Sequence, residues 1–378
     1  MSSLLSDSEM LLKKTVEDFA KREVAPKAST IDRTGEYPFE TVRKLARMNL
    51  LGIPISQSYG GAGAGMKNFA ISVQELAKVC SNTAFICGVH TMAALSIQLF
   101  GTEDQKKTFL TPLGRGERIG AFAMTEPQAG SDAGAIKTLA IRKGGEYLLN
   151  GNKCFITNAG AAGIYLVFAS TDPSKGSRGI SAFIVEGNNP GIRVGKIEDK
   201  IGLRASSNGE IVLEACKIPE KNVLGKEGDG FKIALTALDY GRIGAAAMGV
   251  GLAEASLEAS VAYAKERVQF GQTIASFQAI QFAIADMATE TEAAKLLCYE
   301  AATLADRNEK FTKHAAMAKV YASEVALRTS ERAIQVHGGY GLSRELPVER
   351  YMRDAKTLAI IEGTSEIQRL IVAREVLR

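Results

Sequence analysis

One acidic residue near the C-terminus, Glu362, stands in a sequence that suits acid–base chemistry. It follows four apolar or small residues (LAII) and precedes a Gly-Thr turn that leads into a predicted helix. Apolar neighbours raise the pKa of a carboxyl group toward neutral pH, where a general base works best. The simpler interpretation is a carboxylate that stabilises the start of a helix through the helix dipole, with Glu366 solvated beyond it. Periodicity alone favours the simpler interpretation.

Two other segments end apolar strands with groups that donate hydrogen bonds. The segment 123–132 (AMTEPQAGSD) carries Thr125, Gly130 and Ser131 in a turn, and such turns bind the carbonyl or phosphate groups of ligands. The segment 153–158 (KCFITN) offers an aromatic face and a hydroxyl group. Taken alone, each segment is more typical of a loop than of a ligand site.

The glycine cluster Tyr59–Gly65 (YGGAGAG) invites comparison with a dinucleotide-binding loop. It does not fit the G-x-G-x-x-G register, because the third glycine position falls at Met66. The cluster also follows a predicted helix, whereas a Rossmann phosphate loop follows a strand. We therefore interpret it as a turn and do not expect a nicotinamide cofactor.

Composition excludes several classes of protein. The 378 residues include 46 Lys and Arg against 42 Asp and Glu, a net charge of +4 with no block of like charges, so a nucleic-acid partner is not expected. The five cysteines are odd in number, widely spaced and lack a C-x-x-C pair, which argues against a disulfide framework and a metal site. A reducing compartment fits best, either the cytoplasm or an organelle matrix. No signal peptide or membrane span is expected in the chain.

The periodicity of apolar residues predicts which elements position these candidate residues. Residues 6–28 read as an amphipathic helix that opens with a capping box, Ser6-x-x-Glu9. Residues 38–48 and the stripe through Phe69 and Val73 predict further helices, and 82–100 is apolar nearly all round, as in a buried helix. The first 118 residues are therefore predicted to form an N-terminal helical domain.

The pattern changes after residue 118 and changes back after 226. Short runs rich in Val, Ile and Phe, such as YLVFA and ISAFIV, alternate with Gly and Asn turns, which predicts an antiparallel β domain over 119–226. Long helical patterns return at 231–265, 277–306, 311–337 and from 365 to the end. The expected fold class is α+β, with a C-terminal four-helix bundle over 227–378.

Seven segments, in this order, together resemble the acyl-CoA dehydrogenase family. They are MTEPQAGSD, KCFITN, KIGLRASS, NVLGKEGDGFKIALTALDYGRIGAAA, RVQFGQTIASFQAIQF, QVHGGYG and MRDAKTLAIIEGTSEIQR. The resemblance covers essentially the whole chain, and the family has the same order of α, β and α domains. It implies noncovalently bound FAD, with the flavin ring between the β domain and the C-terminal helices.

The resemblance also implies a role for individual residues. Those expected near the flavin and its pyrophosphate are Phe122, Met124, Thr125, Gly130, Ser131, Phe155, Ile156 and Thr157. Thr364 and Glu366, which follow the base, are also expected to bind the cofactor. Those expected to hold the adenosine and pyrophosphate across a subunit interface are Arg267, Gln269, Phe270, Phe277, Gln278, Gln335, Val336, Gly338 and Gly339. Phe155 stands where many members carry tryptophan, a residue that this chain lacks.

For the substrate, the resemblance implies Glu362 as the catalytic base and an acyl-CoA thioester as the molecule bound. The residues expected to contact it are Ser131, Asp239, Tyr240, Gly241, Arg242 and Gly363. Gly241 matches the position of the base in the isovaleryl branch of the family, which leaves Glu362 as the motif carboxylate. Arg242 either contacts substrate or pairs with a carboxylate in the helical core.

The expected reaction is α,β-dehydrogenation of a short-chain, branched or alicyclic acyl-CoA, with electrons passed to an electron-transferring flavoprotein. Ile361, in place of a common aromatic residue, and the stretch HTMA at 90–93 alter the acyl pocket. The resemblance also implies the oligomeric state usual in the family, a homotetramer built as a dimer of dimers. The alternatives are an acyl-CoA oxidase and a noncatalytic scaffold with a flavin fold.

Overall fold

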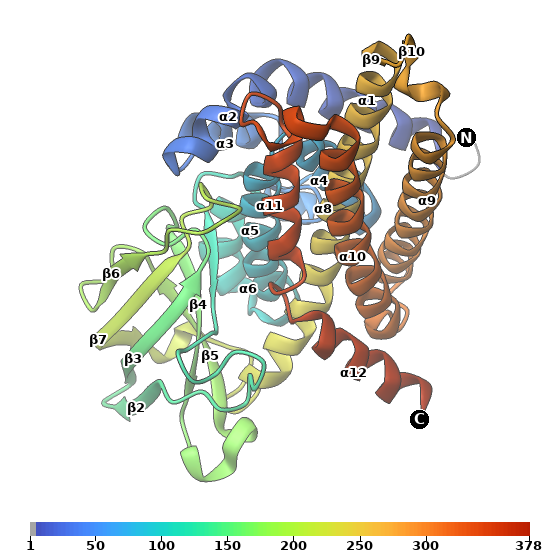
Figure 1. The fold of residues 1–378 in the computed structure, drawn as a ribbon. Helices are drawn as coiled ribbons and strands as arrows, with labels where there is room; N and C mark the ends of the chain where they lie inside the picture. The colour runs from blue at the N-terminus through green and yellow to red at the C-terminus, as the bar shows by residue number, and fades with distance from the viewer. Residues whose placement is uncertain (1–4) are drawn as a thin grey trace.

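The computed structural model describes residues 5–378, in which helices, a β sheet and helices follow one another along the chain (Figure 1). The first four residues of the predicted N-terminal domain lie outside this range. The helices of the N-terminal part are α1 (Asp7–Phe19), α2 (Ala25–Thr34), α3 (Phe39–Arg47), α4 (Gly65–Val79), α5 (Ser81–Phe100), α6 (Glu103–Gln105) and α7 (Thr111–Gly114). The predicted capping box is confirmed, because Ser6 and Glu9 bond to each other's backbone N–H.

Helix α5 is the central helix of this part. It is long and apolar enough to cross a membrane, but 78% of its apolar stretch is buried inside the protein. Burial of this kind is typical of a core helix in a folded domain. The YGGAGAG segment lies just before α4, in a turn where Gly60 has φ +82°. Its interpretation as a turn is confirmed, because a helix and not a strand precedes it.

The middle of the chain forms one sheet with strand order β6-β7-β3-β2-β4-β5-β8, and β1 pairs with β4. The strands are β1 (Gly120–Ala123), β2 (Leu139–Lys143), β3 (Glu146–Ile156), β4 (Ile164–Ser170), β5 (Ile180–Glu186), β6 (Ile192–Ile197), β7 (Gly209–Pro219) and β8 (Val223–Leu224). The predicted antiparallel domain needs one correction. The β1–β4 pair is parallel, and β2 also meets β4 in parallel at one residue pair. The β2–β3 hairpin lies between β1 and β4 in sequence, and this long connection permits a parallel pair.

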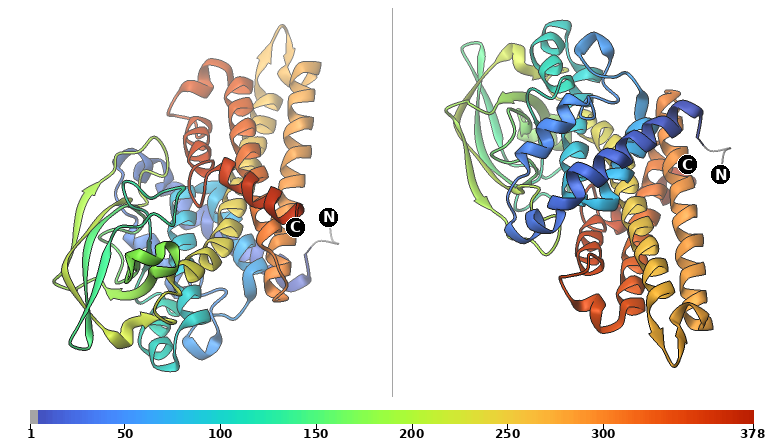
Figure 2. Two further views of the ribbon diagram at one scale, coloured as in Figure 1. Left: turned by 90° about the horizontal axis from the view of Figure 1, so that it is seen from below. Right: turned by 90° about the horizontal axis from the view of Figure 1, so that it is seen from above.

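The C-terminal helices run side by side and extend away from the sheet (Figure 2). They are α8 (Gly230–Glu266), α9 (Gln278–Asp306), α10 (Thr312–His337), α11 (Val348–Leu358) and α12 (Ser365–Val376), with a small hairpin of β9 (Val268–Gln269) and β10 (Gln272–Thr273) between α8 and α9. Glycines let α8 approach its neighbours closely: a Cβ on Gly251 would lie 2.4 Å from Gln74 O in α4, and one on Gly249 2.7 Å from Ala322 O in α10. Helix α8 therefore joins the N-terminal and C-terminal helices into one core.

Candidate functional site

Glu362 lies in the tight turn between α11 and α12, and its backbone is in the left-handed region. Its φ is +55°, and that of Gly363 is +90°. A residue with a side chain adopts this conformation only when surrounding contacts hold it there, and such strain is common at functional sites. The turn is closed by Ser365 N–H, which donates to Ala359 O at 2.9 Å, and by the Thr364 hydroxyl, which caps α12.

Two side chains fix the backbone of this turn from outside it. The ammonium group of Lys319, in α10, donates to Gly363 O at 2.7 Å. The amide of Gln368, one turn into α12, donates to Glu362 O at 3.1 Å and to Gly363 O at 3.0 Å. These three bonds hold the strained backbone conformation of Glu362.

The carboxylate of Glu362 points toward α5 and α8. A Cβ atom on Gly241 would lie 2.4 Å from Met92 Sδ and 2.9 Å from Glu362 Oε2, so the thioether and the carboxylate flank one point beside Gly241. Loss of water in these surroundings raises the pKa of Glu362 to about 7, although the positive charges of Arg242 and Lys319 act in the opposite direction. The direction that the apolar sequence around Glu362 predicted is confirmed.

The other predicted substrate residues on α8 make contacts within the protein. The Arg242 guanidinium donates to Asp239 Oδ1 at 2.5 Å, and the Thr312 hydroxyl donates to Asp239 Oδ2 at 2.7 Å. Tyr240 packs edge-on against Phe311 at the start of α10, with ring centroids 5.0 Å apart. Arg242 is buried and pairs with Asp239. This contact agrees with the second role considered for Arg242, that of pairing with a carboxylate in the helical core.

The two strand-end segments of the β domain lie against each other. Thr125 O accepts from Cys154 N–H at 2.9 Å. The fully buried ammonium group of Lys153 donates to Met124 O at 3.1 Å and to Glu126 Oε1 at 2.7 Å. Glu126 also accepts from the backbone N–H groups of residues 137 and 138. This buried ion pair therefore fastens the predicted flavin loop to β3.

Phe155, near the end of β3, has a φ of +56° and is 60% exposed. Ser131 is also exposed, and a Cβ on Gly130 would meet nothing within 4 Å. Three predicted neighbours of the flavin are instead buried: Met124 and Ile156 belong to the core, and the Thr157 hydroxyl accepts from Asn208. Phe122 is partly buried and packs on Phe168. Of the residues assigned to the flavin, Phe155, Gly130 and Ser131 are therefore the ones exposed in the chain.

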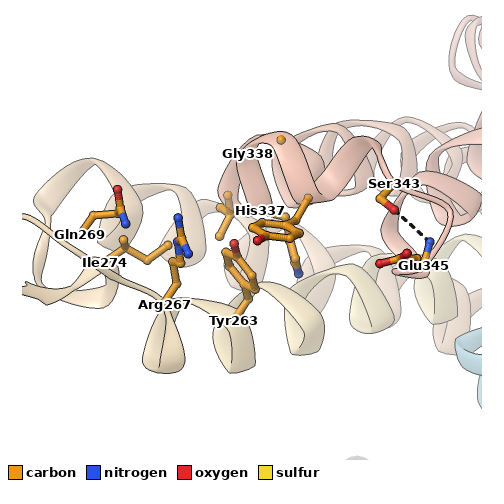
Figure 3. Close-up of a pocket in the computed structure, with 11 residues that line it drawn as sticks. Tyr263, Arg267, Gln269, Ile274, His337, Gly338, Ser343 and Glu345 are labelled. Atoms are coloured by element: carbon orange, nitrogen blue, oxygen red, sulfur yellow. Dashed lines mark hydrogen bonds between the residues drawn. The ribbon is translucent and has the colours of Figure 1, made fainter.

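A cavity of about 500 Å³ opens between the end of α8 and the end of α10 (Figure 3). Four residues that line it in addition to Arg267 were predicted: Gln269, Val336, Gly338 and Gly339. The remaining lining residues were not assigned from the sequence: Tyr263, Ile274, His337, Tyr340, Ser343 and Glu345. His337 and Tyr340 lie within the QVHGGYG motif, so that motif was the signal for them.

The walls of this cavity suit an aromatic ring and a phosphate group. Tyr263 and His337 stack with centroids 4.3 Å apart, and the Arg267 guanidinium lies 5.7 Å from the centroid of the Tyr340 ring. A Cβ on Gly338 or Gly339 would meet nothing within 4 Å, so the backbone there is open to a ligand. Arginine binds phosphate through two parallel hydrogen bonds.

Other residues predicted for the adenosine end do not line the cavity. Phe270 is 93% exposed at the tip of the β9–β10 hairpin and touches Phe277, with centroids 6.0 Å apart. Gln278 and Gln335 are also exposed. Beside the base, Thr364 caps α12 and Glu366 is solvated, as the simpler interpretation of Glu366 supposed.

The two groups of residues assigned to FAD lie far apart in one chain. Figures 1 and 2 place the β9–β10 end of the helices at the opposite end of the molecule from the sheet. Each group fits one part of FAD: open space and the exposed Phe155 ring suit the flavin, and the cavity at Arg267 suits a ring with phosphate.

Comparisons with known proteins identify the family. Residues 6–117, 121–216 and 228–377 match, in order, the N-terminal, middle and C-terminal domains of acyl-CoA dehydrogenase. An acyl-CoA dehydrogenase of Bacillus subtilis is 48% identical over 99% of both chains. The structure of butyryl-CoA dehydrogenase from Megasphaera elsdenii, 44% identical, matches with a TM-score of 0.98 over the whole of both chains. A chain solved in work on the electron-transferring flavoprotein of Acidaminococcus fermentans matches equally well, with a TM-score of 0.98, 44% identity and full coverage of both chains. The chain therefore belongs to the acyl-CoA dehydrogenase family, and it is an oxidoreductase whose cofactor is FAD.

Proposed function

We propose that this protein removes two hydrogens across Cα–Cβ of a short-chain acyl-CoA thioester, with Glu362 as the base that takes the α-proton. The observation that carries the proposal is the Glu362 carboxylate, whose pKa of about 7 matches the working pH of a general base. When bound, FAD supplies the acceptor for the hydride from the β carbon. All other parts of the reaction fall to side chains and backbone groups of this protein.

The backbone of the Glu362 turn supports a second role beside that of base. The described contacts of the chain include no partner for the N–H of Glu362, whereas the carbonyls of Glu362 and Gly363 are occupied by Gln368 and Lys319. A thioester carbonyl that accepts from this N–H has its oxygen stabilised as negative charge develops during removal of the α-proton. In this proposal the strained turn supplies both the N–H of Glu362, for the thioester carbonyl oxygen, and the Glu362 carboxylate, for the α-proton on the adjacent carbon.

The wall of the site favours a small acyl group. The sequence suggested that Gly241 leaves extra room near the reacting carbons for branched or cyclic groups, but Met92 Sδ and the Glu362 carboxylate already take that room. Met92, a residue of α5, is 2% exposed. We therefore favour a short straight chain over a branched or alicyclic one, in keeping with the butyryl-CoA dehydrogenase relative.

The separation of the two FAD groups supports an assembly of several copies. A single FAD that touches both groups must bridge two chains, and a pair related by a two-fold axis would complete two sites at once. We propose a homotetramer made of two such pairs. The electron acceptor is proposed to be an electron-transferring flavoprotein, in keeping with the relative from Acidaminococcus fermentans.

The substitution Glu362→Gln tests the assignment of the base. It keeps the shape of the side chain and removes its basicity, so FAD and acyl-CoA should still bind while butyryl-CoA reduces the flavin at least ~100-fold more slowly. The measurement is anaerobic stopped-flow mixing followed by flavin absorbance. Glu366→Gln, four residues on and solvated, is the matched control and should react at the normal rate. Near-normal bleaching in Glu362→Gln would show that another group is the base.

Two measurements separate the proposal from its alternatives. An acyl-CoA oxidase would consume oxygen and release peroxide on addition of substrate without any flavoprotein acceptor. A noncatalytic scaffold would hold flavin that substrate does not bleach. We expect rapid bleaching under anaerobic conditions and slow oxygen consumption in air.

A further inference from the structure

A buried lysine that the proposed reaction does not use lies directly behind the Glu362 turn. Lys319, in the middle of α10, is 0% exposed, and its ammonium group donates to Gly363 O at 2.7 Å. No carboxylate lies within 4.0 Å of this ammonium among the ion pairs of residues 5–378. Burial of a charge without a close counter-ion destabilises the folded protein, and an apolar residue at this position would avoid that loss of free energy.

The electrostatic partner of Lys319 is Glu362. Burial lowers the pKa of Lys319 to about 8, and the negative charge of Glu362 is the largest influence acting in the opposite direction. In return, the positive charge of Lys319 lowers the pKa of Glu362, which burial raises. The two residues therefore favour each other's charged form.

The groups around the Glu362 carboxylate differ in what else they contact. Helix α8 contributes Arg242, whose positive charge lowers the pKa of Glu362 more than the charge of Lys319 does and whose guanidinium donates to Asp239. Helix α5 contributes the neutral Met92, and α12 contributes Glu366, which is solvated, and the neutral Gln368. Of these two cations, Lys319 on α10 is the one that also holds the backbone of the turn, through its hydrogen bond to Gly363 O.

We propose that Lys319 is a positioning residue for the base: its buried ammonium group anchors, through Gly363 O, the strained turn that carries Glu362 and places a positive charge behind that turn. The inference rests on the proposed role of Glu362. It assigns to α10 a function in the reaction beyond packing against α8 and α12.

The direction of the expected effect follows from the sign of the charge. Without the cation the pKa of Glu362 rises, so a smaller fraction is ionised at neutral pH. The rate of flavin reduction should then reach its plateau at higher pH. A shift of about one unit lowers the rate about tenfold at any pH well below the original pKa of Glu362.

The experiment compares three variants of the full-length holoenzyme. Lys319→Gln keeps a donor for Gly363 O but removes the charge, and Lys319→Arg keeps the charge. Ser323→Ala is the matched control, because Ser323 lies one turn along the same helix and carries no charge; its hydroxyl donates to Lys319 O at 2.7 Å and also lies 3.2 Å from Leu358 O. Flavin reduction by butyryl-CoA is measured from pH 5.5 to 10.

We expect the profile of Lys319→Gln to move upward by about one pH unit, with the rate recovering at high pH, while Lys319→Arg and Ser323→Ala keep the normal profile. A second readout does not depend on turnover: the infrared band of the Glu362 carboxyl, identified by its loss in Glu362→Gln, should titrate at correspondingly higher pH in Lys319→Gln. If that band titrates at the same pH with and without Lys319, the inference is wrong. Normal bleaching in Glu362→Gln would instead overturn the proposed base, while the infrared titration would still test the coupling.

Discussion

At the scale of single residues, the candidate base is defined by contacts from distant parts of the chain. The sequence around Glu362 predicted the direction of its pKa shift, since apolar neighbours desolvate a carboxyl group. It did not predict Lys319, which reaches the Glu362 turn from α10, and it placed Met92 in the acyl pocket, as part of the HTMA stretch, without predicting that Met92 lies beside the base. Contacts between residues so far apart in sequence depend on helix packing, and the local pattern carries no sign of them.

The raised pKa of Glu362 predicts a pH-dependent cost in stability. The ordinary pKa of the carboxyl is 4.5 and the folded protein raises it to about 7, so the folded state binds this proton more tightly than the unfolded chain. The associated stability is fully present below pH 4.5 and is lost as pH rises through 7. Glu362→Gln has no charge to bury. Its thermal midpoint relative to the natural protein should therefore increase between pH 5 and pH 8.

Differential scanning of the holoenzyme at several pH values measures this trend. Glu366→Gln is the control, because the pKa of Glu366 is lowered in the folded protein and its removal should not give a rising difference. A difference for Glu362→Gln that stays constant from pH 5 to pH 8 would contradict the raised pKa.

The space beside Gly241 leads to another prediction for single residues. A Cβ there would lie 2.4 Å from Met92 Sδ and 2.9 Å from Glu362 Oε2, both too close, so Gly241→Ala must displace the thioether or the base. Misplacement of a catalytic group by about 1 Å costs up to about 100-fold in rate. We expect slower flavin reduction in Gly241→Ala and partial recovery in the double variant with Met92→Ala, which frees the space.

The control for this prediction lies one turn along the same helix. A Cβ on Gly244 would meet Phe69 at 3.4 Å, an ordinary contact, so Gly244→Ala should react at nearly the normal rate. Failure of Met92→Ala to improve Gly241→Ala would mean that the loss comes from α8 itself and not from crowding of the base.

At the scale of elements, local patterns predicted most of the fold. The helices predicted at 231–265 and 311–337 are found at Gly230–Glu266 and Thr312–His337, because long amphipathic stretches and their flanking turns mark such helices clearly. Helix α11 was not predicted; it is short, and few of its residues are buried. The parallel β1–β4 pair was also missed, since the pairing of strands distant in sequence is set by the packed domain and not by alternation within a strand.

The buried ion pair between β3 and the predicted flavin loop gives a prediction about these elements. Lys153→Met leaves the Glu126 carboxylate buried without its cation and frees Met124 O, so we expect a loss of about 3–5 kcal/mol in the free energy of unfolding. FAD should also dissociate more readily, because the loop that carries Thr125 loses its anchor. Urea denaturation and the release of flavin fluorescence measure the two effects.

An exposed ion pair on the same sheet provides the control. Arg142 in β2 pairs with Glu220, and both side chains are largely solvated. Arg142→Met should therefore cost less than about 1 kcal/mol and leave FAD binding unchanged. Equal losses from Lys153→Met and Arg142→Met would mean that burial gives the Lys153 pair no special role.

At the scale of the whole molecule, the distance between the two groups of residues assigned to FAD has to be explained, since one FAD in a single chain would not reach both. The sheet, in which Phe155 stands near the end of β3, and the β9–β10 hairpin beside the Arg267 cavity lie at opposite ends of the structure. The hairpin beside the cavity also exposes Phe270 almost completely, and α9 exposes Phe282 and Leu296. Apolar groups left in water on this scale are typical of a surface that another chain covers. A flavin site shared between two copies accounts for both observations.

Mixed oligomers give a direct test of the shared site. Arg267→Ala damages the cavity, and Gly130→Trp fills the open space at the sheet edge, so each variant alone should lose FAD, while the exposed Arg193→Ala should keep it. If each site combines the sheet edge of one copy with the cavity of another, coexpression of the two damaged chains rebuilds intact sites. In a random mixture about a quarter of the sites pair an intact edge with an intact cavity. Flavin absorbance per chain in the purified mixture should therefore recover to about a quarter of the normal value, with the recovered flavin bleached by butyryl-CoA. A mixture that stays colourless while its chains coassemble would show that edge and cavity belong to separate sites.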